Sequence, residues 1–134
     1  MSHVVPMTVR FADLDPWGHV NHARYLSYFE SARVELLEEI GYGIMAMGAG
    51  GRQIVLVEAS VRYFLACGLH DVLDISTCVT AMGRATSHWR QEASRGEDLA
   101  ATLEIRAAFT DLDGRPARPP EGFAAAIAPY RAGS

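Results

Sequence analysis

The spacing of apolar residues changes twice in the first third of the chain. Over residues 7–11 apolar and polar residues alternate, which is typical of a strand with one buried face. Pro16 and Gly18 interrupt the pattern over 13–23, which is therefore interpreted as a loop. From 24 to 40 the apolar residues recur with a helical period, and Gly41 stands where such a helix would end. The predicted apolar face of this helix consists of Tyr25, Phe29, Ala32, Leu36 and Ile40.

The rest of the chain alternates in steps of two after a glycine-rich stretch, 41–52, which is expected to be a flexible connector. A turn at 111–114 and a short helix near 121–127 follow the last predicted strand. The predicted strands are 53–65, 72–82, 86–95 and 99–110. The first of them is expected to place on one face Val55, Val57, Ala59, Val61, Tyr63 and Leu65.

One long helix beside a run of strands predicts an α+β fold. The short links between successive strands favour antiparallel pairing, and one helix can cover one face of the resulting sheet. We expect a curved antiparallel sheet wrapped around one long central helix, in a single domain over residues 1–134. The apolar residues exceed what one helix can cover. We therefore expect the edge strands of two copies to pair in a homodimer, and the sequence leaves a further step to a homotetramer open.

The charge of the chain excludes one class of partner. There are 16 acidic residues against 12 basic ones, all of them arginine, for a net charge of −4. Because nucleic-acid binding needs a basic surface, we expect no nucleic-acid partner. No apolar run approaches the roughly 20 residues that span a bilayer. Residues 1–9 lack a secretory pattern, so we expect no membrane association and a cytoplasmic location. Cys67 and Cys78 are expected to be apolar fillers.

Residues 10–25 carry the candidate chemistry of the chain. Asp13 and Asp15 lie where the first predicted strand gives way to the loop that leads into the helix. A helix N-terminus offers free backbone N–H groups and the positive end of a dipole, which suit an oxygen that gains negative charge in acyl transfer. A carboxylate beside it could activate water or attack a carbonyl. A simpler explanation is that the aspartates form turns and that Asn21 caps the helix.

The same segment resembles a known signature. The segment contains the run Phe11-x-Asp13-x-Asp15-x-x-Gly18-His19-Val20-Asn21-x-x-x-Tyr25-Leu26. This run resembles the signature of the 4-hydroxybenzoyl-CoA thioesterase family, a family of hotdog-fold proteins. Segments 28–33, 61–65, 111–116 and 119–121 also resemble the family, so that the similarity extends over residues 7–123. This resemblance implies a hotdog fold and an acyl-CoA thioesterase, which hydrolyses an acyl thioester to a free carboxylic acid and CoA.

The resemblance also implies roles for individual residues. Asp15 falls at the position of the catalytic carboxylate, and the backbone N–H of His22 falls where the thioester carbonyl would be polarised. Arg84 and Arg118 fall near places where relatives hold the CoA phosphates, and the active site would lie at the boundary between two subunits. The other expected substrate contacts are Trp17, Gly18, His19, Asn21 and Tyr25. For Trp17, packing in the core or at a subunit interface is an equal alternative.

Two residues depart from the family pattern. His22 stands where relatives with this signature have a second asparagine, and Ala66 replaces a common proline. Only the backbone of His22 is assigned a role, so its side chain bears on substrate preference rather than on catalysis itself. His19 and His22 beside two aspartates could suggest a metal site. A histidine pair in a loop without further spaced ligands is a weak pattern, so we expect no metal and no cofactor, and His19 is expected to shape the loop by hydrogen bonding.

The sequence leaves other functions open beside the thioesterase. A non-catalytic protein that binds acyl-CoA or acyl-carrier-protein thioesters could have the same fold, because a fold does not determine a function. A thioester dehydratase would need a histidine and an acid placed together along a cleft, which the motif resembles less. The acyl group is not specified. An acidic chain is a poor partner for an acidic carrier protein, which favours CoA as the carrier.

Overall fold

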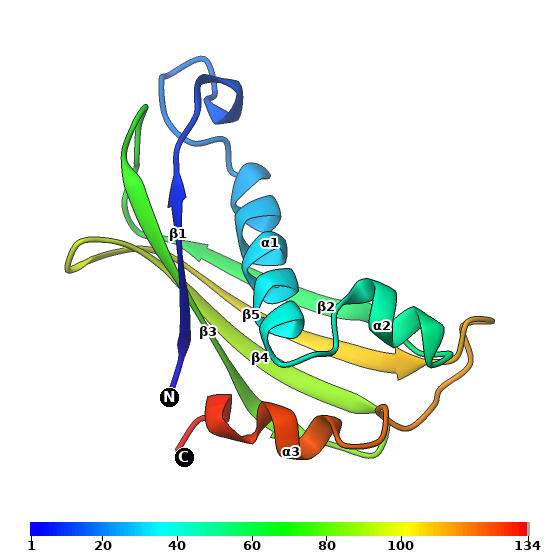
Figure 1. Cartoon of the computed structure of the whole chain (residues 1–134). Coiled ribbons are helices and arrows are strands. Elements are labelled where there is room, and N and C mark those ends of the chain that lie inside the picture. Colours follow the sequence, from blue (N-terminus) through cyan, green and yellow to red (C-terminus); the bar gives the residue numbers. More distant parts are fainter. Residues whose placement is uncertain (134) are drawn as a thin grey trace.

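A five-stranded antiparallel sheet curves around a long helix in the computed structural model of the chain, which describes residues 1–133 (Figure 1). The strands lie in the order β1-β3-β4-β5-β2. Short turns join β3, β4 and β5, whereas β2 lies on the far side of β5 and does not pair with β3. The prediction of a curved antiparallel sheet around one helix is confirmed. The strands are β1 His3–Thr8, β2 Gln53–Tyr63, β3 Val72–Met82, β4 Thr86–Arg95 and β5 Asp98–Thr110.

The long helix, α1, spans Arg24–Glu39 and crosses one face of the sheet (Figure 1). It ends as predicted, because Gly41 adopts the left-handed conformation (φ +86°) that glycine accepts without steric cost. Among residues 1–133, no helix has the length and apolar character needed to cross a membrane. The shorter helical segments are η1 Phe11–Asp13, α2 Ile44–Ala49, α3 Phe123–Ile127 and η2 Ala128–Tyr130.

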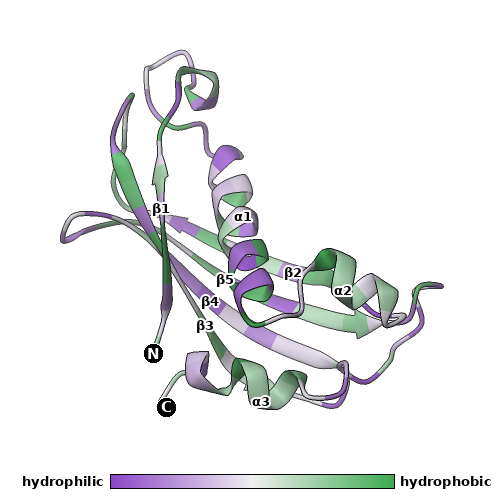
Figure 2. Cartoon of the chain, in the orientation of Figure 1, coloured by the Kyte–Doolittle hydropathy of each residue, from purple (hydrophilic) through white to green (hydrophobic). Residues whose placement is uncertain are grey.

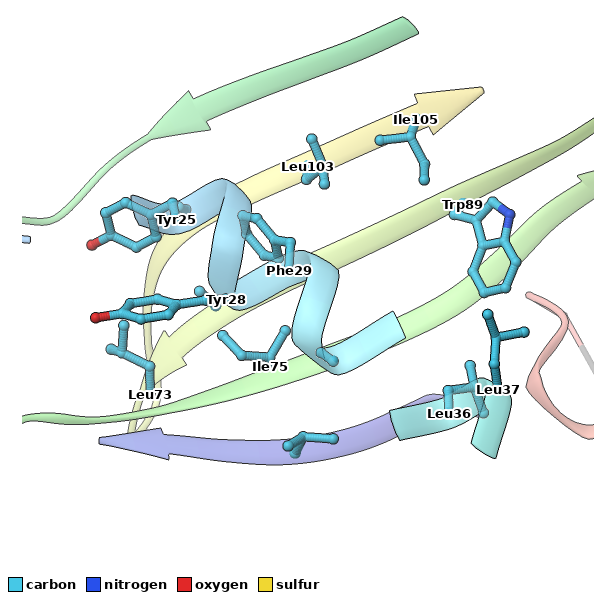
Figure 3. Packing of buried hydrophobic residues seen from close by; sticks show 14 of the residues in the cluster. Tyr25, Tyr28, Phe29, Leu36, Leu37, Leu73, Ile75, Trp89, Leu103 and Ile105 are labelled. Atoms are coloured by element: carbon cyan, nitrogen blue, oxygen red, sulfur yellow. The ribbon is translucent and has the colours of Figure 1, made fainter. Parts of the chain in front are cut away.

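The core lies between α1 and the inner face of the sheet (Figure 3). Both apolar and polar residues occur along α1 and along the strands (Figure 2). The buried apolar residues of α1 recur with the helical period, so that one face of the helix is turned inward. Four of the five residues predicted on the apolar face of α1 are buried, and Ile40 is half-buried. The face of the sheet that α1 covers contributes to the same core the side chains of Leu73, Ile75, Trp89, Leu103 and Ile105.

One polar network crosses this apolar core. The side chain of Gln91 on β4 is fully buried, and its amide donates to the Phe29 carbonyl at 2.8 Å and to the Thr77 hydroxyl at 2.9 Å. Its carbonyl accepts from the Arg33 guanidinium at 2.7 Å. All polar groups of the glutamine side chain therefore have partners, so its burial leaves no unsatisfied hydrogen-bonding group. The same hydrogen bonds fix α1 against the sheet. The sequence pattern alone did not predict this network.

Two predictions about the first half of the chain are wrong. The first strand is His3–Thr8, and the chain turns at Phe11, which is 80% exposed. The turn forms because Arg10 and Asp13 bond to each other: the Asp13 N–H donates to the Arg10 carbonyl, and the Asp13 carboxylate accepts the Arg10 N–H. The glycine-rich stretch 41–52 is not simply a connector, because it contains α2, anchored to the core by the buried Met47.

The prediction of one continuous apolar face on the strand after α2 is also wrong. A bulge at Val57 shifts the register between Leu56 and Glu58, so apolar residues before and after it do not share a face. Strand β2 bonds to β5 along one side only and is an edge of the sheet. Its side chains Val55, Leu56, Val57 and Tyr63 are between 42 and 50% exposed. An exposed apolar edge of this kind favours pairing with another strand.

Candidate active site

The loop before α1 folds back on itself as a short antiparallel ladder. The Asp15 N–H donates to the His19 carbonyl at 2.7 Å, and the Asn21 N–H donates to the Asp13 carbonyl at 2.8 Å. Gly18 lies in the connecting turn with φ +80°, a conformation that favours glycine. His19 contributes to this loop through its backbone, and a role of its side chain stays a prediction. The ladder therefore gives both aspartates fixed positions beside the start of α1.

The two aspartates have different surroundings. Asp13 is only 3% exposed, and its Oδ2 accepts from the Tyr28 hydroxyl at 2.7 Å. Asp15 is half-buried, and its Oδ1 accepts from the backbone N–H groups of Trp17 at 2.9 Å and His19 at 3.1 Å. Within residues 1–133, no donor lies at hydrogen-bond distance from the Oδ2 of Asp15. Asp15 thus forms a turn with one carboxylate oxygen and keeps the other free.

The backbone N–H groups at the start of α1 differ in whether they have an acceptor. The Asn21 N–H bonds to Asp13, the Ala23 N–H bonds to the Asn21 side-chain carbonyl at 2.9 Å, and the Arg24 N–H bonds to the Asn21 backbone carbonyl at 2.9 Å. For the His22 N–H, the described part of the chain supplies no acceptor. Asn21 thus turns the chain towards the helix, but it is not the predicted cap, because the N-cap residue of α1 is Ala23 and no side-chain hydrogen bond caps the helix. The His22 N–H is left available beside the positive end of the helix dipole.

Aromatic residues pack around the backbone of His22. The Tyr63 hydroxyl, at the end of β2, donates to the His22 carbonyl at 2.7 Å. Tyr25 is buried, with its ring in edge contact with Tyr63 at 5.5 Å and with Tyr28 at 6.0 Å. Burial raises the pKa of both Tyr25 and Tyr28 well above the ordinary value. Figure 3 shows the two rings side by side where they leave α1. Tyr25 is only 3% exposed, so this chain alone does not expose its ring to a ligand.

The predicted CoA-binding arginines lie at the other end of the sheet. Ala85 accepts from the Phe109 N–H at 2.7 Å and Ala117 donates to the Phe109 carbonyl at 3.0 Å, so the segments that carry Arg84 and Arg118 flank the end of β5. Tyr63, which contacts His22, pairs with Ala101 on the same strand. A strand rises by about 26 Å from residue 101 to 109. One chain therefore keeps Asp15 apart from both exposed arginines. Figure 1 shows the blue loop before α1 far from the orange segment that follows β5.

A cavity of about 500 Å³ lies between the second half of α1, α2 and strands β2, β4 and β5. This volume is in the range of sites for small organic ligands. The cavity includes three charged residues, Glu30, Arg33 and Arg52, and burial lowers the pKa of Arg33. The cavity leaves no signal in the sequence pattern, because one of its walls is the unpredicted helix α2. Its apolar lining includes Val34, Leu37, Met47, Ile54, Trp89 and Ile105.

The remaining predicted site residues show no further clustering. Trp17 is 81% exposed, which excludes packing in the core of its own chain. Cys67 is buried and Cys78 is half-buried, and both are free thiols. Over residues 1–133 there is no group of three or more histidine, cysteine, aspartate or glutamate side chains that could hold a metal ion.

The profile of the thioesterase-like superfamily matches residues 9–127. The chain belongs to this superfamily. It is 30% identical over 108 residues to an acyl-CoA thioesterase, YbgC, of Haemophilus influenzae, covering 80% of this chain and 79% of the relative. It is 35% identical over 82 residues to the acyl-CoA thioester hydrolase YbgC of Escherichia coli, covering 61% of this chain and 60% of that relative.

Solved structures of the superfamily share the architecture of the chain. A probable thioesterase from Bartonella henselae superposes with a TM-score of 0.86 at 27% identity, covering 90% of this chain and all of the other. The fold is therefore the hotdog fold, and the resemblance of the loop motif to the 4-hydroxybenzoyl-CoA thioesterase family is confirmed. Within that fold, the loop 13–22 combines the free Oδ2 of Asp15 with the free N–H group of His22.

Proposed function

We propose that the protein is an acyl-CoA thioesterase, which hydrolyses an acyl-CoA to a free carboxylic acid and CoA. The observation that carries the proposal is the pairing, on one loop, of the free Oδ2 of Asp15 with the free N–H of His22. A carboxylate and a helix-terminal N–H are the groups that acyl transfer to water needs. Further support comes from the relatives of Escherichia coli and Haemophilus influenzae, which are named as acyl-CoA thioester hydrolase and acyl-CoA thioesterase.

The proposed reaction begins with the thioester carbonyl oxygen accepting the His22 N–H. The Asp15 carboxylate takes a proton from a water molecule, whose oxygen attacks the carbonyl carbon. Negative charge develops on the carbonyl oxygen, where the N–H and the dipole of α1 stabilise it. When the carbonyl forms again the carbon–sulfur bond breaks, and the CoA thiolate leaves and takes up a proton. The products are the carboxylic acid and CoA.

Asp15 could instead attack the carbonyl carbon itself. The thiolate would then leave first, and water would hydrolyse the mixed anhydride on Asp15 to release the acid. Both routes balance and use the same two groups. A mass increase of one acyl group on the enzyme after rapid quenching would identify the covalent route.

A homodimer would bring the separated parts of the site together. Strand β2 is a free, apolar edge, and antiparallel pairing of two β2 strands would give one continuous sheet. The Tyr63 end of β2 adjoins His22, whereas its Gln53 end pairs with Thr110, near the two arginine segments. Two-fold pairing would therefore place the Asp15 end of one subunit beside the arginine end of the other.

The same pairing would define where substrate binds. The partner subunit's Arg84 and the partner subunit's Arg118 would bind the CoA phosphates, which planar guanidinium groups bind well. The cavity reaches β2 at Gln53, Ile54 and Leu56, the end of the strand that would face the Asp15 loop of the other subunit. The acyl group would lie in this cavity, between subunits and beside α1.

The experiment is a screen of short, medium, long and aromatic acyl-CoAs with thiol release as the readout. Asp15→Asn keeps an acceptor for the Trp17 and His19 N–H groups but removes the base, so we expect it to fold and to lose most of its turnover. Asp74→Asn is the control, because it makes the same change at an exposed aspartate of β3 that has no side-chain hydrogen bond in the described part of the chain. Binding without thiol release for every acyl-CoA would contradict the proposal and favour a non-catalytic binding protein.

A further inference from the structure

The peptide unit that joins His22 to Ala23 is held at both of its polar groups. Its carbonyl oxygen accepts the Tyr63 hydroxyl at 2.7 Å, and its N–H donates to the Asn21 side-chain carbonyl at 2.9 Å. A peptide unit is planar and rigid, so two hydrogen bonds at its opposite sides restrict its rotation. The two partners come from different parts of the chain, one from the loop itself and one from the end of β2.

The preceding peptide unit, which contains the His22 N–H, is held at its carbonyl. The Asn21 carbonyl accepts the Arg24 N–H at 2.9 Å, which directs this carbonyl along α1. The N–H of the same planar unit points the opposite way, out of the helix N-terminus. With the planes on both sides of the His22 Cα held, the backbone angles of His22 have little freedom. The Tyr63 hydrogen bond is the part of this arrangement that connects it to the sheet.

Tyr63 is suited to act as a fixed donor. Its ring is in edge contact with the ring of the buried Tyr25, which limits its rotation. Burial raises the pKa of Tyr63, so the hydroxyl keeps its proton at neutral pH. The residue terminates β2, where six successive pairs with β5, from Glu58 to Tyr63, fix the position of this end of the strand. Neither the loop motif nor its spacing indicates Tyr63, which is 41 residues from His22 in the sequence.

We propose that Tyr63 is a positioning residue for thioester hydrolysis, whose hydroxyl holds the His22 carbonyl so that the His22 N–H is aimed at the reacting oxygen. This inference rests on the proposed function. Tyr63 does not itself contact the reacting atoms. A donor that is already oriented needs no reorganisation when charge develops, so its benefit is realised in the transition state. Loss of the tether should therefore lower kcat and leave substrate binding almost unchanged.

The test is Tyr63→Phe, which keeps the ring and its contact with Tyr25 and removes only the hydroxyl. We expect kcat to fall about tenfold, since one net hydrogen bond is worth about that factor, with KM within about twofold of the wild type. The affinity for a non-hydrolysable thioether analogue of acyl-CoA and the pH profile should not change. Tyr130→Phe is the matched control, because Tyr130 is also in edge contact with a ring, that of His3, and its hydroxyl has no hydrogen-bond partner in the described part of the chain.

A second variant addresses the other tether. Asn21→Ala frees the Ala23 N–H, and we expect its effect on kcat and that of Tyr63→Phe to combine less than multiplicatively, because both act on one peptide unit. Faster amide hydrogen exchange at His22 and Ala23 in Tyr63→Phe would show the loosened backbone directly.

The outcomes separate this inference from the proposed function. An unchanged kcat in Tyr63→Phe, with the wild type active, would overturn the positioning role and leave the thioesterase proposal intact. Equal losses in kcat, analogue affinity and thermal stability would also overturn it, since they would show a purely structural role. A wild type that hydrolyses no acyl-CoA would contradict the proposed function, and this inference with it.

Discussion

The hydroxyl of Tyr28 donates a hydrogen bond of 2.7 Å to the Oδ2 of Asp13, and both residues are buried. This contact ties the loop to α1, fifteen residues further along the chain. It also gives Asp13 a structural role that Asp15 does not share, because the Asp15 carboxylate accepts from the Trp17 and His19 N–H groups of its own turn. Of these two acids, which are separated by one residue, Asp13 stabilises the fold and Asp15 is left for the proposed chemistry.

Removal of the Tyr28 hydroxyl should destabilise the fold. Tyr28→Phe leaves the buried Asp13 carboxylate without one of its donors, and a buried group that loses a hydrogen-bond partner costs about 1–3 kcal/mol. We expect the free energy of unfolding in urea to fall by about that amount. The matched Tyr130→Phe change should stay within about 0.5 kcal/mol of the wild type. Equal unfolding midpoints for the two variants would contradict the role assigned to the Tyr28–Asp13 contact.

The helix and the strands of the core could be predicted because their periods are local properties of the sequence. Helix α1 follows from the spacing of Tyr25, Phe29 and Leu36, and its end follows from Gly41. Helix α2 could not be predicted, since it has only six residues between flanking glycines, too few to show a helical period, and it is anchored by burial of Met47 in the core. The bulge at Val57 likewise depends on the partner strand rather than on β2 alone.

The candidate site could be predicted only in part for the same reason. The order of residues in the loop indicates a carboxylate next to a helix start, and the resemblance selects Asp15 and His22. The contacts that distinguish Asp13 from Asp15 come from Tyr28, and the contact that holds His22 comes from Tyr63. Such long-range pairs leave no periodic signal in one sequence. The separation of Arg84 from Asp15 is likewise a consequence of the order of the strands in the sheet, which depends on pairing between segments far apart in the sequence.

Asp71 should make the stability of the protein depend on pH in the acid range. Its Oδ2 accepts the Gly68 N–H at 2.9 Å and the Arg95 guanidinium at 3.0 Å. These two contacts hold the pKa of the Asp71 carboxyl below its ordinary value. Because the folded pKa is the lower one, the ionised carboxylate stabilises the fold above the ordinary pKa of about 4, and this stabilisation is lost as the pH falls through the lowered value.

The corresponding variant is Asp71→Asn. We expect it to be less stable than the wild type at neutral pH, with the difference in the free energy of unfolding shrinking as the pH falls below about 4. Asp74→Asn is the control, because Asp74 is exposed and makes no side-chain hydrogen bond in the described part of the chain. Urea unfolding at a series of pH values gives both curves. A difference between Asp71→Asn and the wild type that stays constant with pH would refute the assignment.

A charge on the free edge of β2 should dissociate the proposed dimer. Val57 is 50% exposed on this edge, and a lysine there would place two like charges at the seam of a continuous sheet. We expect Val57→Lys to sediment as a 14.6 kDa species and to lose activity, because the arginines of a second subunit would be absent. Val72→Lys is the control, since Val72 is 49% exposed but lies on β3, which has neighbours on both sides. A fully active 14.6 kDa wild type would refute the shared site.

The size of the accepted acyl group should depend on Gly48. This residue lies in α2 and lines the cavity, and among residues 1–133 no atom outside its own helix turn lies within 4 Å of the position that its Cβ would take. Gly48→Leu should therefore extend into the cavity without a steric clash and shorten the longest acyl chain that is hydrolysed. Short acyl-CoAs should keep a kcat/KM close to that of the wild type. The matched control is Ala49→Leu, because Ala49 is the next residue of α2 but does not line the cavity. Because an extra methylene in an apolar pocket is worth about 1–3 kcal/mol, the loss for chains that no longer fit should reach at least tenfold in kcat/KM. An identical chain-length profile for the two leucine variants would exclude this cavity as the place where the acyl group binds.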